Sequence, residues 1–137
     1  MKYLSVDWLT TTAIGCCIIP HQEANRASWI SAGYEHFPGT PKYFSDRLPI
    51  ALHSGSAHVV NYHAGYEELF QEGDALCWAV GEEAIIARAG EVLSLGRDYM
   101  TSLGSRAHEF ARRHLTSEVV YGQLIEKLRL IRQERTK

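Results

Sequence analysis

Residues 47–76 read RLPIALHSGSAHVVNYHAGYEELFQEGDAL, and the order of patterns along this stretch decides the fold class. Helical spacing over residues 45–54, with Ser45 as the expected N-cap, ends at Gly55, a usual residue just past a helix. The apolar run 57–60 has the pattern of a buried strand, and residues 65–70 that of a short helix. Strands alternating with helices predict a parallel sheet with right-handed crossovers. The expected class is α/β.

The same alternation continues on both sides of this stretch. Two further apolar runs, residues 16–19 and 75–80, are predicted as buried strands. We expect the three strands to be parallel and adjacent in chain order, because short βα connections favour that arrangement. Further helices are expected over residues 4–14 and 82–93, and the chain from residue 97 onward reads as two consecutive helices.

Composition limits the chain to one domain and a restricted set of partners. It has 137 residues, of which 45% are hydrophobic, enough for one compact core spanning residues 1–137. The formal charge is -2 with mixed signs, so no overall field favours nucleic acid or an anionic membrane. We expect a cytoplasmic protein without a membrane span, because no apolar run approaches about 20 residues. Its three cysteines, without Cys-x-x-Cys spacing, are expected to be reduced core residues.

Ligands of open parallel sheets bind beyond the carboxyl ends of the strands, so the loops there are the first candidates for a site. Gly39 and Thr40 lie in a turn before the helix that begins near Ser45, which makes a suitable cradle for a phosphate. Arg47 or Lys42 would supply the countercharge. An ordinary connection leading into a capped helix explains the same residue types.

Other chemical sites are weaker. Glu67 and Glu68 begin a helix, where acidic residues favour the helix dipole whether or not they bind a ligand. The evenly spaced His53, His58 and His63 are predicted at opposite ends of one strand, so we expect no metal site there. The sequence contains neither a Gly-x-Ser-x-Gly elbow nor a His-Glu-x-x-His motif.

Residues 47–60, continued by residues 65–76, resemble the carboxyl-terminal lobe of group 1 glycosyltransferases. The order of elements carries the resemblance: a helix ending in Ala-Leu and a small residue before glycine, an apolar strand, a glycine turn, Glu-Leu, and a short acidic and glycine-containing loop. A Glu-Glu-Ala-Ile-Ile helix and a last helical pair follow, so the resemblance covers about residues 18–130.

The resemblance implies a GT-B architecture, in which two Rossmann-like lobes face a cleft and the second lobe holds most of the nucleotide sugar. The present chain would be a partial doubly wound sheet with C-terminal helices, the later part of that lobe. No resident cofactor or metal is implied, and the nucleoside diphosphate sugar is the donor substrate. The implied donor-binding residues are His21, Gly39, Thr40, Tyr43, Ser45, Arg47, Gly65 and Glu68.

The sequence departs from the family pattern in two respects. Ile50 stands where the family usually has a glutamate that holds the ribose, and an isoleucine cannot accept those hydrogen bonds. About three strands of the usual lobe are also missing before residues 16–19, which leaves that predicted strand, with Cys16 in it, as a bare edge. We therefore expect a partner chain or self-association through this edge.

Three functions remain open. The chain is expected to be the donor side of an enzyme that transfers a sugar from a nucleoside diphosphate to an acceptor. No catalytic residue is assigned, since the base is expected from an absent lobe, without which the chain would be inactive. A non-catalytic remnant of the same fold is the first alternative. The second is an interaction module that uses the edge strand and the final helix, although a solvated face equally explains the basic residues of the tail.

Overall fold

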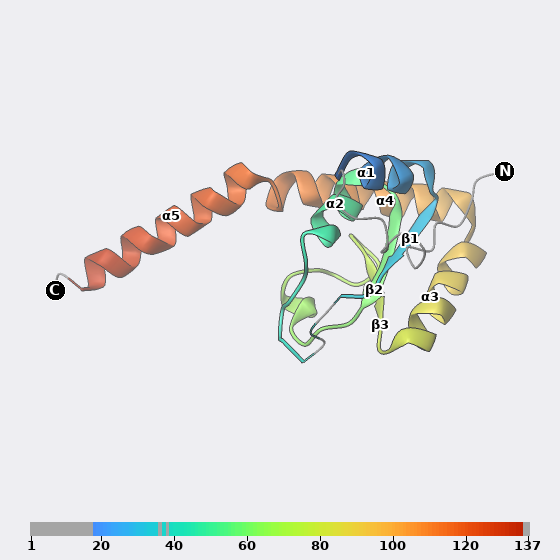
Figure 1. Cartoon of the computed structure of the whole chain (residues 1–137), viewed down its shortest axis with the longest axis horizontal. Coiled ribbons are helices and arrows are strands. Elements are labelled where there is room, and N and C mark those ends of the chain that lie inside the picture. The colour runs from blue at the N-terminus through green and yellow to red at the C-terminus, as the bar shows by residue number, and fades with distance from the viewer. Residues whose placement is uncertain (1–17, 36, 38, 136–137) are drawn as a thin grey trace.

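The computed structural model describes residues 18–35, 37 and 39–135 of the chain. Its centre is a three-stranded parallel sheet of order β1-β2-β3, formed by Ile30–Gly33, Ala57–Asn61 and Cys77–Ala79 (Figure 1). The helices are α1 Ile18–Ala27, α2 Arg47–Ser54, the 3-10 helix η2 Tyr66–Glu68, α3 Glu82–Ser94, α4 Gly96–His114 and α5 Ser117–Glu134. The predicted α/β class with C-terminal helices is confirmed.

Most elements lie where the sequence patterns place them. The strand predicted at residues 57–61 is β2, and β3 occupies the middle of the apolar run 75–80. The helix predicted over residues 82–93 is α3, and the tail forms α4 and α5. Parallel pairing of adjacent strands is confirmed, with Val59 opposite both Ala32 and Cys77.

The position predicted for the first strand is wrong. Ile18 and Ile19 begin α1, and residues 20–25, expected as a loop, continue that helix. The strand beside β2 is β1, which contains a serine and a glycine and lies in a segment where the sequence patterns predict no strand. A short apolar run fits a buried helix as well as a strand, which explains the error. Cys16, Cys17 and the helix predicted over residues 4–14 lie outside the described residues.

The sheet edge expected at Cys16 is therefore corrected as well. Among the described strands, β1 and β3 form the two edges of the sheet, and β2 is central. The carbonyl of Trp29 accepts a hydrogen bond from the amide of Ala57, which fixes the side of β1 that faces β2. The amides of Ile30 and Ala32 accordingly point away from β2, since residues of a strand alternate in direction.

Helix α2 begins one residue later than a Ser45 N-cap predicts. Asp46 is its N-cap, and the Oγ of Ser45 accepts a hydrogen bond from the Arg47 amide at 3.3 Å. Pro49 lies in the first turn, as expected. Gly55 ends the helix with φ 75°, a left-handed conformation that favours glycine.

Two hydrophobic clusters pack on opposite faces of the sheet. The first core cluster consists of Ile30, Ala57, Val59, Cys77, Ile85, Val92, Met100 and Leu103. The second core cluster consists of Leu48, Leu52, Val60, Tyr66, Phe70, Leu76, Ala107 and Ala111. Helix α3 contributes to the first cluster and α2 to the second, whereas β2 and α4 contribute to both.

The last helix, α5, extends away from the sheet and the other helices (Figure 1). None of its residues is buried. Thr116 caps its start, with the side-chain oxygen accepting a hydrogen bond from the Val119 amide at 3.4 Å. Across the residues that the structure describes, no helix has the length and apolar character needed to cross a bilayer.

Candidate functional site

Polar side chains link the chain segments that leave β1 and β2 at their carboxyl ends. The backbone amide of Glu35, two residues after β1, donates a hydrogen bond to Oδ1 of Asn61 at 2.5 Å. Nδ2 of Asn61, the last residue of β2, donates to the carbonyl oxygen of Glu35 at 3.4 Å. Both residues are buried. This double link fixes the start of the loop that leads from β1 to α2.

The buried His63 extends this network. Nδ2 of Asn61 donates to Nε2 of His63 at 2.9 Å, so Nε2 is an acceptor and the ring proton lies on Nδ1. Nδ1 faces the carbonyl oxygen of Thr40 at 3.4 Å. The ring therefore connects the end of β2 to the predicted phosphate turn.

The carboxylate of Glu35 occupies the approach to α2. Its Oε2 accepts a hydrogen bond from the backbone amide of Ser45 at 3.0 Å. The amides of Arg47 and Leu48 bond to the hydroxyl and the carbonyl of Ser45, and Pro49 has no amide hydrogen. The amides of Ser45, Arg47 and Leu48, at the helix start that the sequence assigned to a phosphate cradle, thus have partners within the protein.

Aromatic rings cover the buried network. The rings of Tyr43 and His63 have centroids 5.7 Å apart, and Phe37 meets Tyr43 edge-on at 5.4 Å. The hydroxyl of Tyr66 donates to the carbonyl of Tyr43 at 2.8 Å. Burial raises the pKa of Tyr66 well above its usual value, and the negative charge of Glu35 adds to this shift. Tyr66 therefore remains a protonated donor at neutral pH.

Lys42 fastens the outer side of the loop. Its amide donates to the carbonyl of Ala64 at 2.7 Å, and its ammonium group pairs with Glu68 at 2.5 Å. Gly65 has φ 88°, and a Cβ there would lie 2.7 Å from Cγ of Lys42. The stem of Lys42 therefore crosses directly over Gly65. Glu68 neutralises Lys42, whereas Arg47, at the start of α2, forms no ion pair with another described residue.

The structure brings most of the predicted donor-binding residues to one region. Thr40, Tyr43, Ser45, Gly65 and Glu68 all belong to the two segments that follow β1 and β2, with Glu68 at the end of η2. The remaining predicted residues are placed as follows: Gly39 is exposed in the turn beside Thr40, Arg47 is exposed at the first position of α2, and His21 belongs to α1. His21 was expected in a loop after a strand, and that placement is wrong.

The three evenly spaced histidines bond to separate protein groups. Nδ1 of His53 lies 2.9 Å from the carbonyl of Pro49, and Nδ1 of His58 lies 2.8 Å from Oγ of Ser31. His63 belongs to the network described above. In the described ranges, no three histidine, cysteine, aspartate or glutamate side chains gather in a way that would hold a metal ion.

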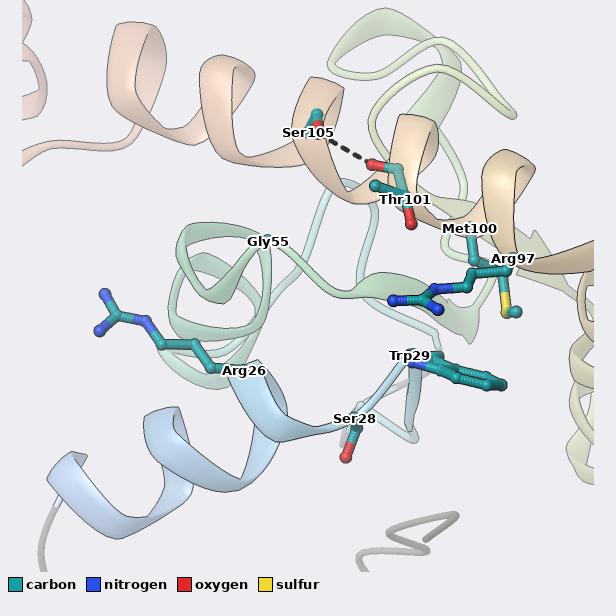
Figure 2. Close-up of a pocket in the computed structure, with 8 residues that line it drawn as sticks. All are labelled: Arg26, Ser28, Trp29, Gly55, Arg97, Met100, Thr101 and Ser105. Atoms are coloured by element: carbon teal, nitrogen blue, oxygen red, sulfur yellow. Dashed lines mark hydrogen bonds between the residues drawn. The ribbon is translucent and has the colours of Figure 1, made fainter. Parts of the chain in front are cut away.

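A cavity of about 180 Å³ lies at the opposite end of the strands, near the amino ends of β1 and β2 (Figure 2). Its lining residues are Arg26, Ser28, Trp29, Gly55, Arg97, Met100, Thr101 and Ser105. The guanidinium of Arg97 lies 5.6 Å from the centroid of Trp29, a cation–π distance, and the two side chains lie beside each other in Figure 2. This cavity is separate from the carboxyl-end network.

Comparisons with known proteins support the fold. No protein-family model and no curated protein matches the chain. Among solved structures, the chain is similar to Anabaena Alr3699/HepE in complex with UDP, with a TM-score of 0.61 and 20% sequence identity. The match covers 76% of this chain but 28% of that chain. The likeness places the described sheet and helices in the fold of one part of a larger UDP-binding protein.

Proposed function

We propose that this chain is the donor-side part of a glycosyltransferase and that it binds the nucleoside diphosphate of a nucleotide sugar at the carboxyl ends of β1 and β2. The supporting observation is the polar network of Glu35, Asn61 and His63, which lies at these carboxyl ends. The fold that carries it is similar to that of UDP-bound HepE. Open parallel sheets bind ligands at this edge.

Arg47 is the proposed ligand of the diphosphate. Its side chain is exposed beside the loop, and the amides of the first turn of α2 are already bonded or absent. A guanidinium forms paired, charge-assisted hydrogen bonds to phosphate oxygens. We therefore assign binding of the diphosphate mainly to the side chain of Arg47 and not to the helix amides.

The buried network would position this site without touching the diphosphate. Glu35, Asn61 and His63 are all buried, whereas Gly39, Thr40 and Glu68 are exposed around them. Arg47 would stabilise the negative charge that develops on the departing diphosphate. We assign no catalytic base, and expect the chain to need the acceptor-side lobe for transfer.

Titration with UDP tests the proposed role of Arg47. The Arg47→Ala variant should bind UDP about 10- to 100-fold more weakly, because hydrogen bonds to a charged group contribute about 1.5–3 kcal/mol. Isothermal titration calorimetry measures the affinity. Where the chain alone binds too weakly, the titration uses an assembly that contains the acceptor-side lobe. As a control, Arg97→Ala removes an exposed arginine near the amino ends of the strands and should leave the affinity unchanged. Equal affinities of the wild type and Arg47→Ala would remove Arg47 from the diphosphate site.

A non-catalytic remnant of the same fold is the second candidate. It is favoured by Ile50, which provides no acceptor for a ribose. An interaction module using the β1 edge and α5 belongs to this alternative. If UDP fails to bind even in an assembly that contains the acceptor-side lobe, this candidate replaces the enzyme proposal.

A further inference from the structure

Helix α5 carries an apolar stripe that no other part of the described chain covers. The stripe consists of Val120, Tyr121, Leu124, Ile125, Leu128 and Ile131, each between 40% and 63% exposed. At 100° per residue these six side chains fall within about 140° of the helix circumference. Leu130 lies on the opposite side of the helix and is 52% exposed. The stripe is thus a continuous face on a helix that extends from the body of the molecule (Figure 1).

The spacing within the stripe is that of a paired helix. Tyr121, Leu124, Leu128 and Ile131 follow one another at intervals of three, four and three residues, which is the a and d spacing of a coiled-coil seam. Ile125 and Val120 widen the seam by one apolar residue on each side. An isolated surface helix without a partner does not need such a seam, since its stability comes from polar pairs and propensity.

The flanking residues indicate which partner fits. Glu118, Ile125 and Arg132 recur at seven-residue intervals along one side of the seam, and Val120, Lys127 and Glu134 along the other. In an antiparallel pair of α5 helices, residues on the same side face each other. When Leu124 lies opposite Leu128 of the second copy, Glu118 of each copy faces Arg132 of the other. Ile125 then faces Ile125 of the second copy.

The parallel arrangement has less favourable charges. There Lys127 faces Arg132 of the second copy, and symmetry repeats this like-charge contact. The antiparallel arrangement has one like-charge contact, between the two Lys127 residues, against two opposite-charge contacts. It also places the two bodies at opposite ends of a helix about 27 Å long, so that they do not overlap.

We propose that two copies of this chain associate through an antiparallel pairing of their α5 helices, with Tyr121, Leu124, Leu128 and Ile131 in the seam. This proposal does not depend on nucleotide binding.

Sedimentation velocity of the full chain over a wide concentration range tests the seam. The wild type should be a dimer, and Leu128→Asp should shift it to a monomer because it places a charge between apolar side chains. Leu130→Asp is the matched control: it makes the same change at a similarly exposed site on the opposite face and should leave the dimer intact. A monomeric wild type overturns the proposal, as does a dimer that Leu128→Asp leaves unchanged.

Charge reversal tests the antiparallel orientation. Glu118→Arg should raise the dimer dissociation constant about tenfold at low salt, because it replaces two attractive contacts with two repulsive ones. Arg132→Glu in addition should restore the wild-type value. Both changes oppose the helix dipole within each chain, so greater helix stability cannot explain a restored dimer. Failure of the double variant to recover overturns the antiparallel arrangement.

Discussion

At the scale of single residues, Gly104 in α4 lies directly against the backbone of Gly55, which follows α2. A Cβ at Gly104 would overlap the carbonyl oxygen of Gly55 and lie 2.8 Å from its carbonyl carbon. The missing side chain allows α4 to pack directly on the turn that leads into β2. The sequence shows a glycine inside a helical pattern but does not show which backbone lies against it.

Gly104→Ala should therefore lower the free energy of unfolding by about 1–3 kcal/mol, as overpacking of a buried site does. The matched control is Gly90→Ala in α3, where an added Cβ meets nothing within 4 Å. That variant should be about 0.5–1 kcal/mol more stable than the wild type, because alanine favours a helix over glycine. Urea denaturation followed by circular dichroism measures both. Equal effects of the two substitutions would contradict the close packing of Gly104.

The candidate site was predictable only in part from its residue types. Thr40, Tyr43 and Ser45 were found because they precede a recognisable helix. Glu35 was missed, since β1 was placed in the wrong segment and nothing then marked Glu35 as following a strand. Asn61 was not singled out, and His63 was considered only as a metal ligand. The hydrogen bond between Asn61 and Glu35 crosses 26 residues of sequence and depends on which strands are neighbours, and His63 joins the network through Asn61.

At the scale of elements, two tethers of different character hold the loop between β1 and α2. Asn61 bonds to Glu35 and His63 where all three are buried, whereas Lys42 and Glu68 form an ion pair with side chains 45% and 63% exposed. Water and salt screen the exposed pair, so it contributes little. Removing the buried amide leaves the Glu35 amide and His63 Nε2 without their partner.

We expect Asn61→Ala to lower the free energy of unfolding by about 1–3 kcal/mol and Lys42→Ala to lower it by less than about 1 kcal/mol. Thermal and urea unfolding of the two variants provide the comparison. A loss for Lys42→Ala as large as that for Asn61→Ala would show that the outer tether, and not the buried network, holds the loop.

Element prediction succeeded where the hydrophobic period was clear. The helix closed by Gly55, the run of β2, and the amphipathic α3 and α4 each had such a period. The β1 strand has four residues, with Ser31 and Gly33 among them, so neither its apolar content nor its length distinguished it from a loop. Pairing with β2 gives this segment its strand conformation, and that interaction is not local in sequence.

At the scale of the whole molecule, the two core clusters share structural elements and should unfold together. Val59 and Val60 are consecutive in β2 but belong to the first and second core clusters. Helix α4 likewise places Leu103 in the first cluster and Ala107 in the second. Opening one face of the sheet therefore removes support from the other, as in a single cooperative unit.

Val60→Ala tests this coupling, since the substitution removes two methyl groups from the second core cluster alone. It should lower the free energy of unfolding by about 2 kcal/mol. Native-state hydrogen exchange should show this loss both in α2, which packs in the second cluster, and in α3, which packs in the first. If α3 kept its protection while α2 lost it, the two faces would be independent units, and the three-stranded sheet would not transmit stability between them.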